Sequence, residues 1–213
     1  MTEPSALLDT GAAYDAVASL YAELFSNVLE VLPMERTLLA AFAELVQAHD
    51  AGPVADLGCG PGHLTAHLHA LGLNTFGIDL SPAMVALARQ AHPGLRFDEG
   101  SMTALDLADG VLGGILASYS IIHTPPRRLP AVFAEFQRVL APGGHVLLGF
   151  FAGDDPLPRE FDHKVTLAYR WSADSLAELS RQAGFVEVAR LRREPHPGER
   201  FQQAHLLVRK PQA

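Results

Sequence analysis

Three glycines separated by single residues form the segment of this sequence that is best suited to bind a ligand. Gly58, Gly60 and Gly62 follow a short apolar run that begins at Val54. Glycine permits a tight backbone turn and lets a ligand approach without a Cβ in the way. Where a first strand turns into a first helix, such a loop borders the crevice at the carboxyl edge of an open α/β sheet, in which ligands bind. Residues 54–63 therefore predict a binding site.

Three details of this turn indicate the class of ligand. Its spacing is G-x-G-x-G, whereas dinucleotide-binding loops follow G-x-G-x-x-G. Asp56 precedes Gly58 by two residues, so we expect a carboxylate at the mouth of the crevice, which opposes a pyrophosphate and suits an ammonium or sulfonium group. Pro61 removes an N–H at the start of the helix, where a phosphate needs donors. The turn thus favours a cationic amino-acid nucleoside.

Asp79 is a second carboxylate with a defined place in this pattern. It ends the next predicted strand, 21 residues after Gly58. An acidic residue about 20 residues beyond a glycine turn accepts hydrogen bonds from ribose hydroxyls. This spacing fits the adenosine of S-adenosylmethionine and that of NAD equally.

His123 follows the fourth predicted strand, in the segment SIIHTPP beside the same crevice. An imidazole can remove a proton near neutral pH, so His123 is the candidate general base and a candidate contact to the substrate. A loop histidine that only shapes the pocket is the alternative. His163 and Tyr169, further along the chain, are candidate substrate contacts or, alternatively, solvent-facing groups of an edge segment.

Two other reactive residue types predict no site. His63 and His67 have the i, i+4 spacing of metal ligands, but no third ligand is evident, so we expect no metal. Cys59 is the single cysteine of the chain, and a nucleophilic cysteine needs an activating base. We therefore expect Cys59 to be a small residue that fills the loop.

An alternation of strands and helices must position these residues. Ser81 followed by Pro82 marks a helix start, and the run 111–120 is apolar on both faces, which is typical of a central strand. Repeated alternation implies a parallel sheet with right-handed crossovers. The predicted strands are 53–58, 73–79, 95–100, 111–120 and 145–151, and the predicted helices between them are 63–72, 82 onward and 127–140.

The segments on either side of this alternation predict additions to one domain. Apolar residues at helical spacing indicate helices at 14–32 and 34–48, separated at Pro33. A possible strand lies at 163–171, followed by a helix capped by Ser172 and a closing hairpin. The predicted parts of the domain 1–213 are an N-terminal helical cap (1–50), a core (51–151), an excursion on the acceptor side (152–171) and a closing helix and hairpin (172–213).

Composition and charge exclude several classes of protein. The 213 residues carry a formal net charge of −8, so nucleic acid is not an expected partner. No run of 18 uncharged apolar residues indicates a membrane span, and MTEPSALLDT lacks the basic region of a signal peptide. A single cysteine excludes an internal disulfide framework. We therefore expect a cytoplasmic protein without a membrane partner, and no oligomeric state is predicted.

The quoted segments together resemble a known family. VADLGCGPGH followed by FGIDLSPAMVALAR is similar to the first two motifs of the class I S-adenosylmethionine-dependent methyltransferases, in the small-molecule branch. LAPGGHVLLGF and RWSADSLAELSRQAGF resemble later parts of the same family, and the resemblance runs from Tyr14 to Lys210. It implies an α/β, Rossmann-like fold with a mainly parallel seven-stranded sheet, an antiparallel last strand and helices on both faces.

The resemblance also implies a reaction and a set of contacts. S-adenosylmethionine gives its methyl group to a small-molecule acceptor by in-line displacement and leaves as S-adenosylhomocysteine, while the protein positions the reactants and excludes water. The implied contacts are Asp56, Gly58 and Gly60 to the methionine part, Asp79 to the ribose, Leu80, Met84, Ser101 and Met102 to the adenine, Ser118 and Tyr119 beneath the methionine part, and Tyr14 and Tyr21 closing over the cofactor. For Tyr14 and Tyr21 the alternative role is simple packing within their helix.

Two other functions stay open at this point. An NAD-dependent oxidoreductase has a similar sheet, although the loop spacing and Asp56 count against it. A non-catalytic protein that keeps the cofactor as a ligand or regulator is the other. Methylation of DNA adenine is disfavoured, because the adenine-modifying branch carries an N-P-P-Y-like motif after the fourth strand, where this chain reads SYSIIH.

Overall fold

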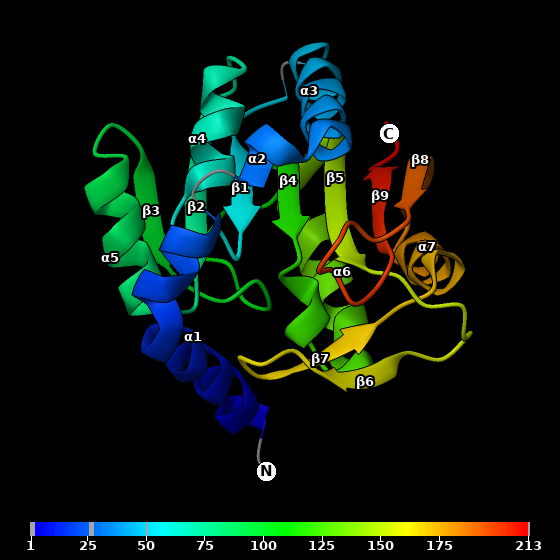
Figure 1. Cartoon of the computed structure of the whole chain (residues 1–213). Coiled ribbons are helices and arrows are strands. Elements are labelled where there is room, and N and C mark those ends of the chain that lie inside the picture. Colours follow the sequence, from blue (N-terminus) through cyan, green and yellow to red (C-terminus); the bar gives the residue numbers. More distant parts are fainter. Residues whose placement is uncertain (1–2, 26–27, 50, 213) are drawn as a thin grey trace.

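A seven-stranded sheet forms the centre of the computed structural model, which describes residues 3–25, 28–49 and 51–212. The strand order is β3-β2-β1-β4-β5-β9-β8 (Figure 1). The strands from β3 to β5 pair in parallel, and β9 runs antiparallel to both of its neighbours. The predicted fold class is confirmed. The strands are β1 (Val54–Leu57), β2 (Thr75–Asp79), β3 (Arg96–Glu99), β4 (Leu112–Ser118), β5 (Leu140–Phe151), β8 (Val186–Arg193) and β9 (Gln203–Arg209).

Helices cover both faces of the sheet because its central strands are apolar on both sides. Ile115 and Leu148 pack in the core cluster beneath α6 and α7, whereas their neighbours Leu116 and Leu147 pack against α3 and α4. Successive strand residues point to opposite faces, so each face requires its own layer. The helices of the two layers are α3 (Pro33–Gln47), α4 (His63–Ala70), α5 (Pro82–Ala91), α6 (Leu129–Val139) and α7 (Ala173–Gln182).

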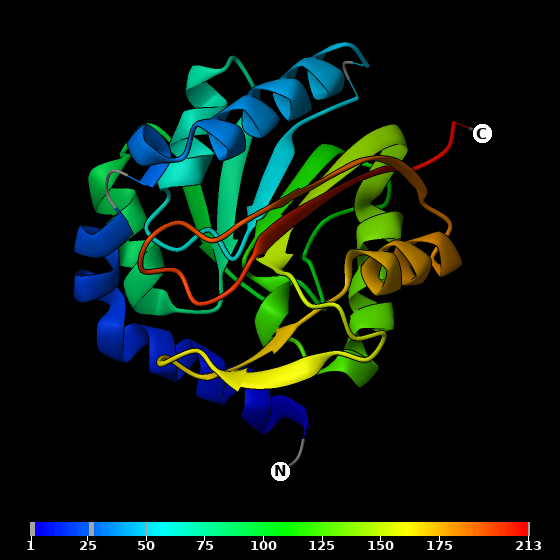
Figure 2. The ribbon, with the colours of Figure 1, turned by 45° about the vertical axis from the view of Figure 1, so that its right-hand side comes forward.

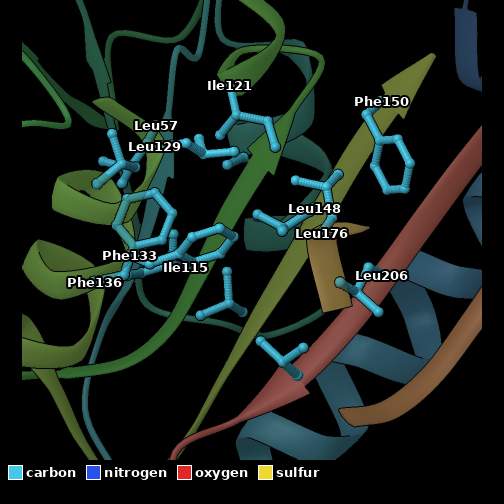
Figure 3. Close-up of a cluster of buried hydrophobic side chains, with 14 of the residues drawn as sticks. Leu57, Ile115, Ile121, Leu129, Phe133, Phe136, Leu148, Phe150, Leu176 and Leu206 are labelled. Atoms are coloured by element: carbon cyan, nitrogen blue, oxygen red, sulfur yellow. The ribbon is translucent and has the colours of Figure 1, made fainter. Parts of the chain in front are cut away.

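Helix α6 shows how the apolar spacing produces this packing. Leu129, Val132, Phe133, Phe136 and Val139 recur at the spacing of one helical face and are all fully buried. Figure 3 shows the labelled leucine and the two phenylalanines of α6 within the cluster that also holds Ile115 and Leu148. Burial of each such side chain stabilises the fold by roughly 1.5–3 kcal/mol.

The N-terminal helices differ from the predicted pair in extent. Helix α1 (Glu3–Phe25) begins well before residue 14, and α2 (Val28–Val31) is a separate single turn. The predicted continuous helix 14–32 is therefore wrong, and its residues 26 and 27 lie outside the described ranges. Pro33 opens α3 at a position where its missing N–H costs nothing. No helix in the described ranges combines the length and apolar character that crossing a membrane requires.

Strand β5 begins earlier than predicted. The segment 141–144 was expected to form a turn before a strand at 145, but β5 starts at Leu140, which pairs with Leu112. The register then shifts, so that Gly114 pairs with His145. A bulge of this kind tolerates Pro142, which has no N–H for a ladder. Pro142, Gly143 and Gly144 therefore lie within β5 and not in a turn that precedes it.

The excursion after β5 forms a small antiparallel pair, β6 (Arg159–Asp162) and β7 (Leu167–Arg170). β7 falls within the predicted strand, and β6 was not predicted. Ser172 caps α7 as expected, accepting a hydrogen bond from the Ser175 N–H at 3.0 Å. The closing hairpin of β8 and β9 is confirmed. Figures 1 and 2 place α1 and the β6–β7 pair at the same end of the sheet, where the parallel strands finish.

Candidate active site

The backbone donors of the glycine turn are all engaged within the protein. A pyrophosphate needs free N–H groups at the start of the first helix, and Pro61 has none to offer. The four other N–H groups of residues 58–62 are those of Gly58 and Cys59, which donate to the Ile78 carbonyl at 2.7 and 3.2 Å, of Gly62, which donates to the Cys59 carbonyl at 3.1 Å, and of Gly60, which donates to Asp79 Oδ2 at 2.8 Å. These four N–H groups are therefore used within the protein and are not available to a phosphate.

The same turn requires glycine on steric grounds. Gly58 has φ +75°, and a Cβ at this position would overlap the side chain of Ser120. Gly62 has φ +84°, and a Cβ there would lie 2.8 Å from the ring of Phe97. Other residues rarely adopt positive φ. Packing therefore explains Gly58 and Gly62, whereas at Gly60 the reason is the backbone conformation, φ +52°, since a Cβ there would lie 3.9 Å from the ring of Tyr21.

Asp79, at the end of β2, is held in one orientation by backbone donors. Its Oδ2 accepts the Gly60 N–H at 2.8 Å, and its Oδ1 accepts the Ser81 N–H at 2.9 Å. Burial raises the pKa of Asp79, while these two hydrogen bonds act in the opposite direction. Each carboxylate oxygen keeps a further lone pair. The carboxylate is thus preorganised to accept hydroxyl donors from a ligand beside it.

Asp56 does not lie at the mouth of the crevice, so that prediction of its position is wrong. Its side chain is only 1% exposed and lines neither of the two cavities described below. Asp56 Oδ2 accepts a hydrogen bond from Thr65 Oγ1 at 2.6 Å, behind the glycine turn. Burial raises the pKa of this carboxyl to about 7. Asp56 therefore supplies no charge at the mouth of the crevice that would oppose a phosphate.

Helix α1 lies across the crevice and is attached to the core at two points. Asp15 Oδ1 accepts hydrogen bonds from Ser81 Oγ at 2.6 Å and from the Ala83 N–H at 3.0 Å, at the start of α5. The Tyr14 hydroxyl lies 2.8 Å from His123 Nε2. The rings of Tyr14 and Tyr21 meet edge to face, 5.8 Å apart. Both tyrosines therefore combine packing within α1 with a place in the crevice wall.

A small cavity of about 80 Å³ lies between α1 and the strand ends. It gathers most of the residues that the sequence assigned to the cofactor, which come from α1, β2, α5 and β4 and from the loops that follow β1 and β3. The residues assigned to the cofactor that lie in its lining are Tyr14, Tyr21, Gly58, Gly60, Asp79, Leu80, Met84, Met102, Ser118 and Tyr119, and His123, the candidate general base, lies there too.

A larger cavity of about 420 Å³ adjoins the small one. Its walls come from α1 to α3, the ends of β4 and β5, the β6–β7 segment and the loop between β8 and β9. The two cavities share Tyr21, Gly58, Gly60, Ser118 and Tyr119 in their linings. Reactants bound in the two cavities therefore meet at the glycine turn and at the carboxyl end of β4.

Tyr119 occupies this junction with an unusual backbone. It has φ +53°, a left-handed conformation that is uncommon for a residue with a side chain. The Tyr119 N–H donates to the Gly149 carbonyl at 2.8 Å, and its ring lies 5.2 Å from that of Phe151. Residues held in such conformations concentrate at functional sites.

His123 lies in the crevice with both ring nitrogens engaged. Nδ1 lies 2.9 Å from the Leu167 carbonyl, which can only accept, so Nδ1 carries the proton and Nε2 accepts from the Tyr14 hydroxyl. Burial lowers the pKa of His123 to about 4. His123 lines the small cavity and is absent from the lining of the large one. The ring is thus neutral at pH 7 and oriented toward Tyr14.

Three further assigned residues occupy different surroundings. Ser101 Oγ is hydrogen-bonded to Thr103 Oγ1 at 2.8 Å, and neither cavity includes Ser101 in its lining. Tyr169 is 7% exposed, belongs to the main core cluster and lines neither cavity. His163 lines the large cavity, with its ring 5.1 Å from that of His123. The structure thus brings His163 into the site and leaves Ser101 and Tyr169 beside it.

Several residues of the two cavities had no signal in the sequence. Thr10 and Gly11 of α1 line the small cavity, where a Cβ at Gly11 would lie 3.0 Å from the Leu80 carbonyl oxygen. Glu35, Gln203 and His205 line the large cavity as buried polar side chains. Their positions in apolar-looking elements mark them only once the strands and helices are assembled.

Comparison with known proteins identifies the core of the chain. A family model described as a methyltransferase domain matches residues 54–144. A malonyl-[acyl-carrier protein] O-methyltransferase of Pectobacterium atrosepticum is 31% identical over 119 residues, which are 56% of this chain and 46% of that protein. A demethylmenaquinone methyltransferase of Chlorobaculum parvum is 34% identical over 152 residues, 63% of this chain and 62% of that protein. The chain thus spans about half to three-fifths of the length of these relatives.

One solved structure covers nearly the whole chain. The 1,6-didemethyltoxoflavin-N1-methyltransferase of Burkholderia thailandensis, solved with 1,6-didemethyltoxoflavin and S-adenosylhomocysteine bound, superposes with a TM-score of 0.66 at 25% identity. The match covers 94% of this chain and 90% of that one. Taken with the strand order and the match to the family model, this supports a class I S-adenosylmethionine-dependent methyltransferase.

Proposed function

We propose that this protein transfers the methyl group of S-adenosylmethionine to a small molecule bound in the large cavity. One observation carries the proposal: the cavity lined by Asp79 and the cavity lined by aromatic side chains meet at the glycine turn. A donor and an acceptor held in adjoining cavities gain the proximity and alignment that a displacement reaction requires. The relatives and the bound ligands of the similar structure support the same assignment.

The residues of the crevice suit the chemistry of this cofactor, which is larger than the small cavity of about 80 Å³ and would extend across the shared junction into the large one. Asp79, fixed by two backbone N–H groups, would hold the ribose hydroxyls, and the apolar side chains of Leu80, Met84 and Met102 would border the adenine. Gly58 and Gly60 would lie along the methionine part, together with Ser118 and Tyr119 of the junction. A turn whose N–H groups are used within the protein suits a ligand without phosphate. When bound, the cofactor supplies an electrophilic methyl group on a sulfonium.

The chain's own contribution is to orient the reactants and to exclude water. Tyr21 and Tyr14 would close over the cofactor from α1, and Asp15 holds that helix against the start of α5. His123, which accepts from the Tyr14 hydroxyl, would act as a positioning residue for Tyr14 in place of the predicted general base. The pKa of His123 is about 4, so protonation of its ring should not lower kcat/KM between pH 5.5 and 8. A fall in kcat/KM toward the acid end of that range would indicate that His123 is the general base after all.

The experiment is a transfer assay with S-adenosylmethionine that carries a deuterated methyl group. The purified protein is incubated with this donor and a library of small molecules, and products are detected by mass spectrometry. A product that carries the deuterated methyl group, absent without protein, is the expected result. Tight binding of S-adenosylhomocysteine with no labelled product from any acceptor would favour the non-catalytic alternative.

A small-molecule acceptor in place of nucleic acid, a cytoplasmic location and a single domain over 1–213 are proposals that rest on the sequence.

A further inference from the structure

The large cavity contains a buried ion-pair network that the cofactor site does not use. Arg193, near the end of β8, donates from Nε to Glu35 Oε1 at 2.6 Å. The same guanidinium forms a fork with Glu199, from Nη1 at 2.6 Å and from Nη2 at 2.8 Å. The side chains of Arg193 and Glu35 are only 9% and 8% exposed. Glu35 opens α3 and lies far from Arg193 in sequence, so the assembled cavity creates this pair.

Three buried polar atoms in this part of the cavity are left over; two are acceptors, and the third is a histidine nitrogen that accepts or donates according to its tautomer. Glu35 Oε2, Gln203 Oε1 and His205 Nδ1 are buried and have no hydrogen-bond partner among the residues that the structure describes. All three residues line the large cavity. A buried acceptor without a donor costs free energy, and the cost is larger for a charged group. The cluster is therefore complementary to a ligand that brings N–H or O–H donors.

The charges of the cavity make an anionic ligand a poor match for this end. The carboxylates of Glu35 and Glu199, whose side chains are 8% and 27% exposed, outnumber the single guanidinium of Arg193. That guanidinium already uses four of its five N–H groups on Glu35, Glu199 and the Glu194 carbonyl. Burial lowers the pKa of His205 to about 4, so its ring adds no positive charge at pH 7.

Two further cations line the cavity in its solvent-exposed part. Lys164 and Arg200 are both exposed, and Arg200 lies over the ring of Phe201 with its guanidinium carbon 5.1 Å from the ring centroid. Interactions of exposed charges with a ligand at the buried end are weakened by water and salt. The buried network therefore decides the charge that the inner part of the cavity accepts.

The other walls of the cavity are aromatic. Tyr21 and Phe25 of α1 stack with ring centroids 4.3 Å apart. Across the cavity lining, Phe161 meets Phe151 at 5.3 Å and Phe201 at 4.9 Å, edge to face in both cases. Flat π surfaces and ring edges pack well against a planar ring. Walls of this kind favour a planar ligand.

We propose that the acceptor is an uncharged planar ring compound that presents an N–H or O–H donor, and that Glu35 Oε2 receives this donor. Glu35 is thereby a specificity-determining residue, and an acceptor with a carboxylate at the same edge is excluded. The inference rests on the proposed function, because it assigns the substrate class of the same site.

The first test compares small probes on the protein loaded with S-adenosylhomocysteine. Benzimidazole and quinolin-2-one carry a ring N–H, their N-methyl derivatives do not, and quinoline-4-carboxylate carries an anion. Dissociation constants are measured by ligand-observed NMR or calorimetry. We expect each N–H compound to bind about tenfold or more tightly than its N-methyl partner and than the carboxylate, as the loss of one hydrogen bond to a charged group implies. No difference within the pairs, including no binding by either member, or preferred binding of the carboxylate, would overturn the proposal.

The second test separates the unpaired oxygen from the charge of the network. Glu35→Gln keeps the shape of the side chain but presents either an amide NH₂ or an uncharged oxygen to the ligand, whereas Glu199→Gln makes the same change in charge and leaves Glu35 Oε2 in place. We expect the preference for N–H compounds to fall to within about twofold in Glu35→Gln and to persist in Glu199→Gln. Equal loss in both variants would assign the preference to net charge and contradict the role of Glu35. The wild-type comparison stands by itself if either variant fails to fold, as judged by thermal melting.

Binding of S-adenosylhomocysteine distinguishes failure of this inference from failure of the proposed function. Affinity for S-adenosylhomocysteine that is unchanged within about twofold in Glu35→Gln is the expected result. A drop of tenfold or more would mean that Glu35 holds the ammonium group of the cofactor, which overturns the assignment to the acceptor but preserves the function. No affinity in the wild type would refute the proposed function itself.

Discussion

The two adjoining cavities, which we propose serve one reaction, are built in different ways. At the small cavity the N–H groups of the glycine turn are occupied internally, and the N–H groups of Gly60 and Ser81 fix Asp79. The large cavity is shaped by side chains from segments far apart in the chain, among them Glu35 of α3 and Arg193 of β8. A backbone turn needs glycine at fixed spacing, whereas a set of converging side chains leaves no local pattern. The cofactor side can therefore be read from a local sequence pattern, and the acceptor side cannot.

Among the variants considered, Asp79→Asn should weaken cofactor binding most. The amide keeps the shape but places an NH₂ group against one of the two backbone N–H donors, at Gly60 or Ser81, and removes the charge. We expect the affinity for S-adenosylhomocysteine to fall roughly 100-fold, the effect of losing hydrogen bonds to a charged group. Calorimetry measures it, with the exposed Asp174→Asn on α7 as a control. An affinity within threefold of wild type would show that Asp79 does not hold the ribose.

The pH dependence of stability shows whether the buried carboxyl of Asp56 is protonated in the folded protein. Its pKa is raised to about 7, so the folded protein holds a proton that the unfolded chain releases between pH 4 and 7. Wild type therefore loses free energy of unfolding, relative to Asp56→Asn, as the pH rises from about 4 to about 7, and the difference is constant above that range. We expect a change of roughly 2–3 kcal/mol between pH 5 and pH 8 from urea unfolding curves. The opposite slope would place an ionised, stabilised carboxylate there.

Tyr14→Phe removes one of the two attachments that hold α1 over the small cavity. The variant loses the 2.8 Å hydrogen bond to His123 Nε2 and leaves that buried nitrogen without its donor. We expect the affinity for S-adenosylhomocysteine to fall about fivefold, near the net value of one hydrogen bond. Tyr169→Phe, in the core and outside both cavity linings, serves as the matched control. Equal effects from the two variants would indicate a general loss of stability.

Phe161→Ala should separate the two cavities with the smallest effect on the cofactor. Phe161 lines the large cavity and not the small one, so we expect the affinity for S-adenosylhomocysteine to stay within about twofold of wild type. The KM for any acceptor found should rise about fivefold or more, because the bound acceptor loses its contact with the Phe161 ring. Titration and steady-state kinetics provide the two numbers. A large loss of cofactor affinity would mean that the cavities are not independent.

The same contrast explains how much of the structure could be predicted from the sequence. Strands and helices of the core follow from apolar periodicity, as the fully buried face of α6 shows, and the glycine turn follows from its spacing. The extent of α1 and the bulge in β5 did not, because tertiary packing and a register shift decide where these elements begin.

Side-chain direction was the harder problem within the site. Asp56 was placed at the crevice because of its distance along the chain from Gly58, but its side chain points behind the turn to Thr65. Alternation along β1 sends successive side chains to opposite faces, so a shift of one residue separates the two outcomes. Glu35 and Gln203 carried no signal, since a lone polar residue in an apolar element is read as exposed until its neighbours in space are known.

The occupied N–H groups of the glycine turn should make this protein accept a sulfonium nucleoside and reject a pyrophosphate. The decisive experiment is calorimetric titration of the wild-type protein with S-adenosylhomocysteine and with NADH. We expect a saturable isotherm for S-adenosylhomocysteine that weakens in Asp79→Asn, and no detectable heat for NADH. Saturable binding of NADH without binding of S-adenosylhomocysteine would show that the turn selects a dinucleotide instead.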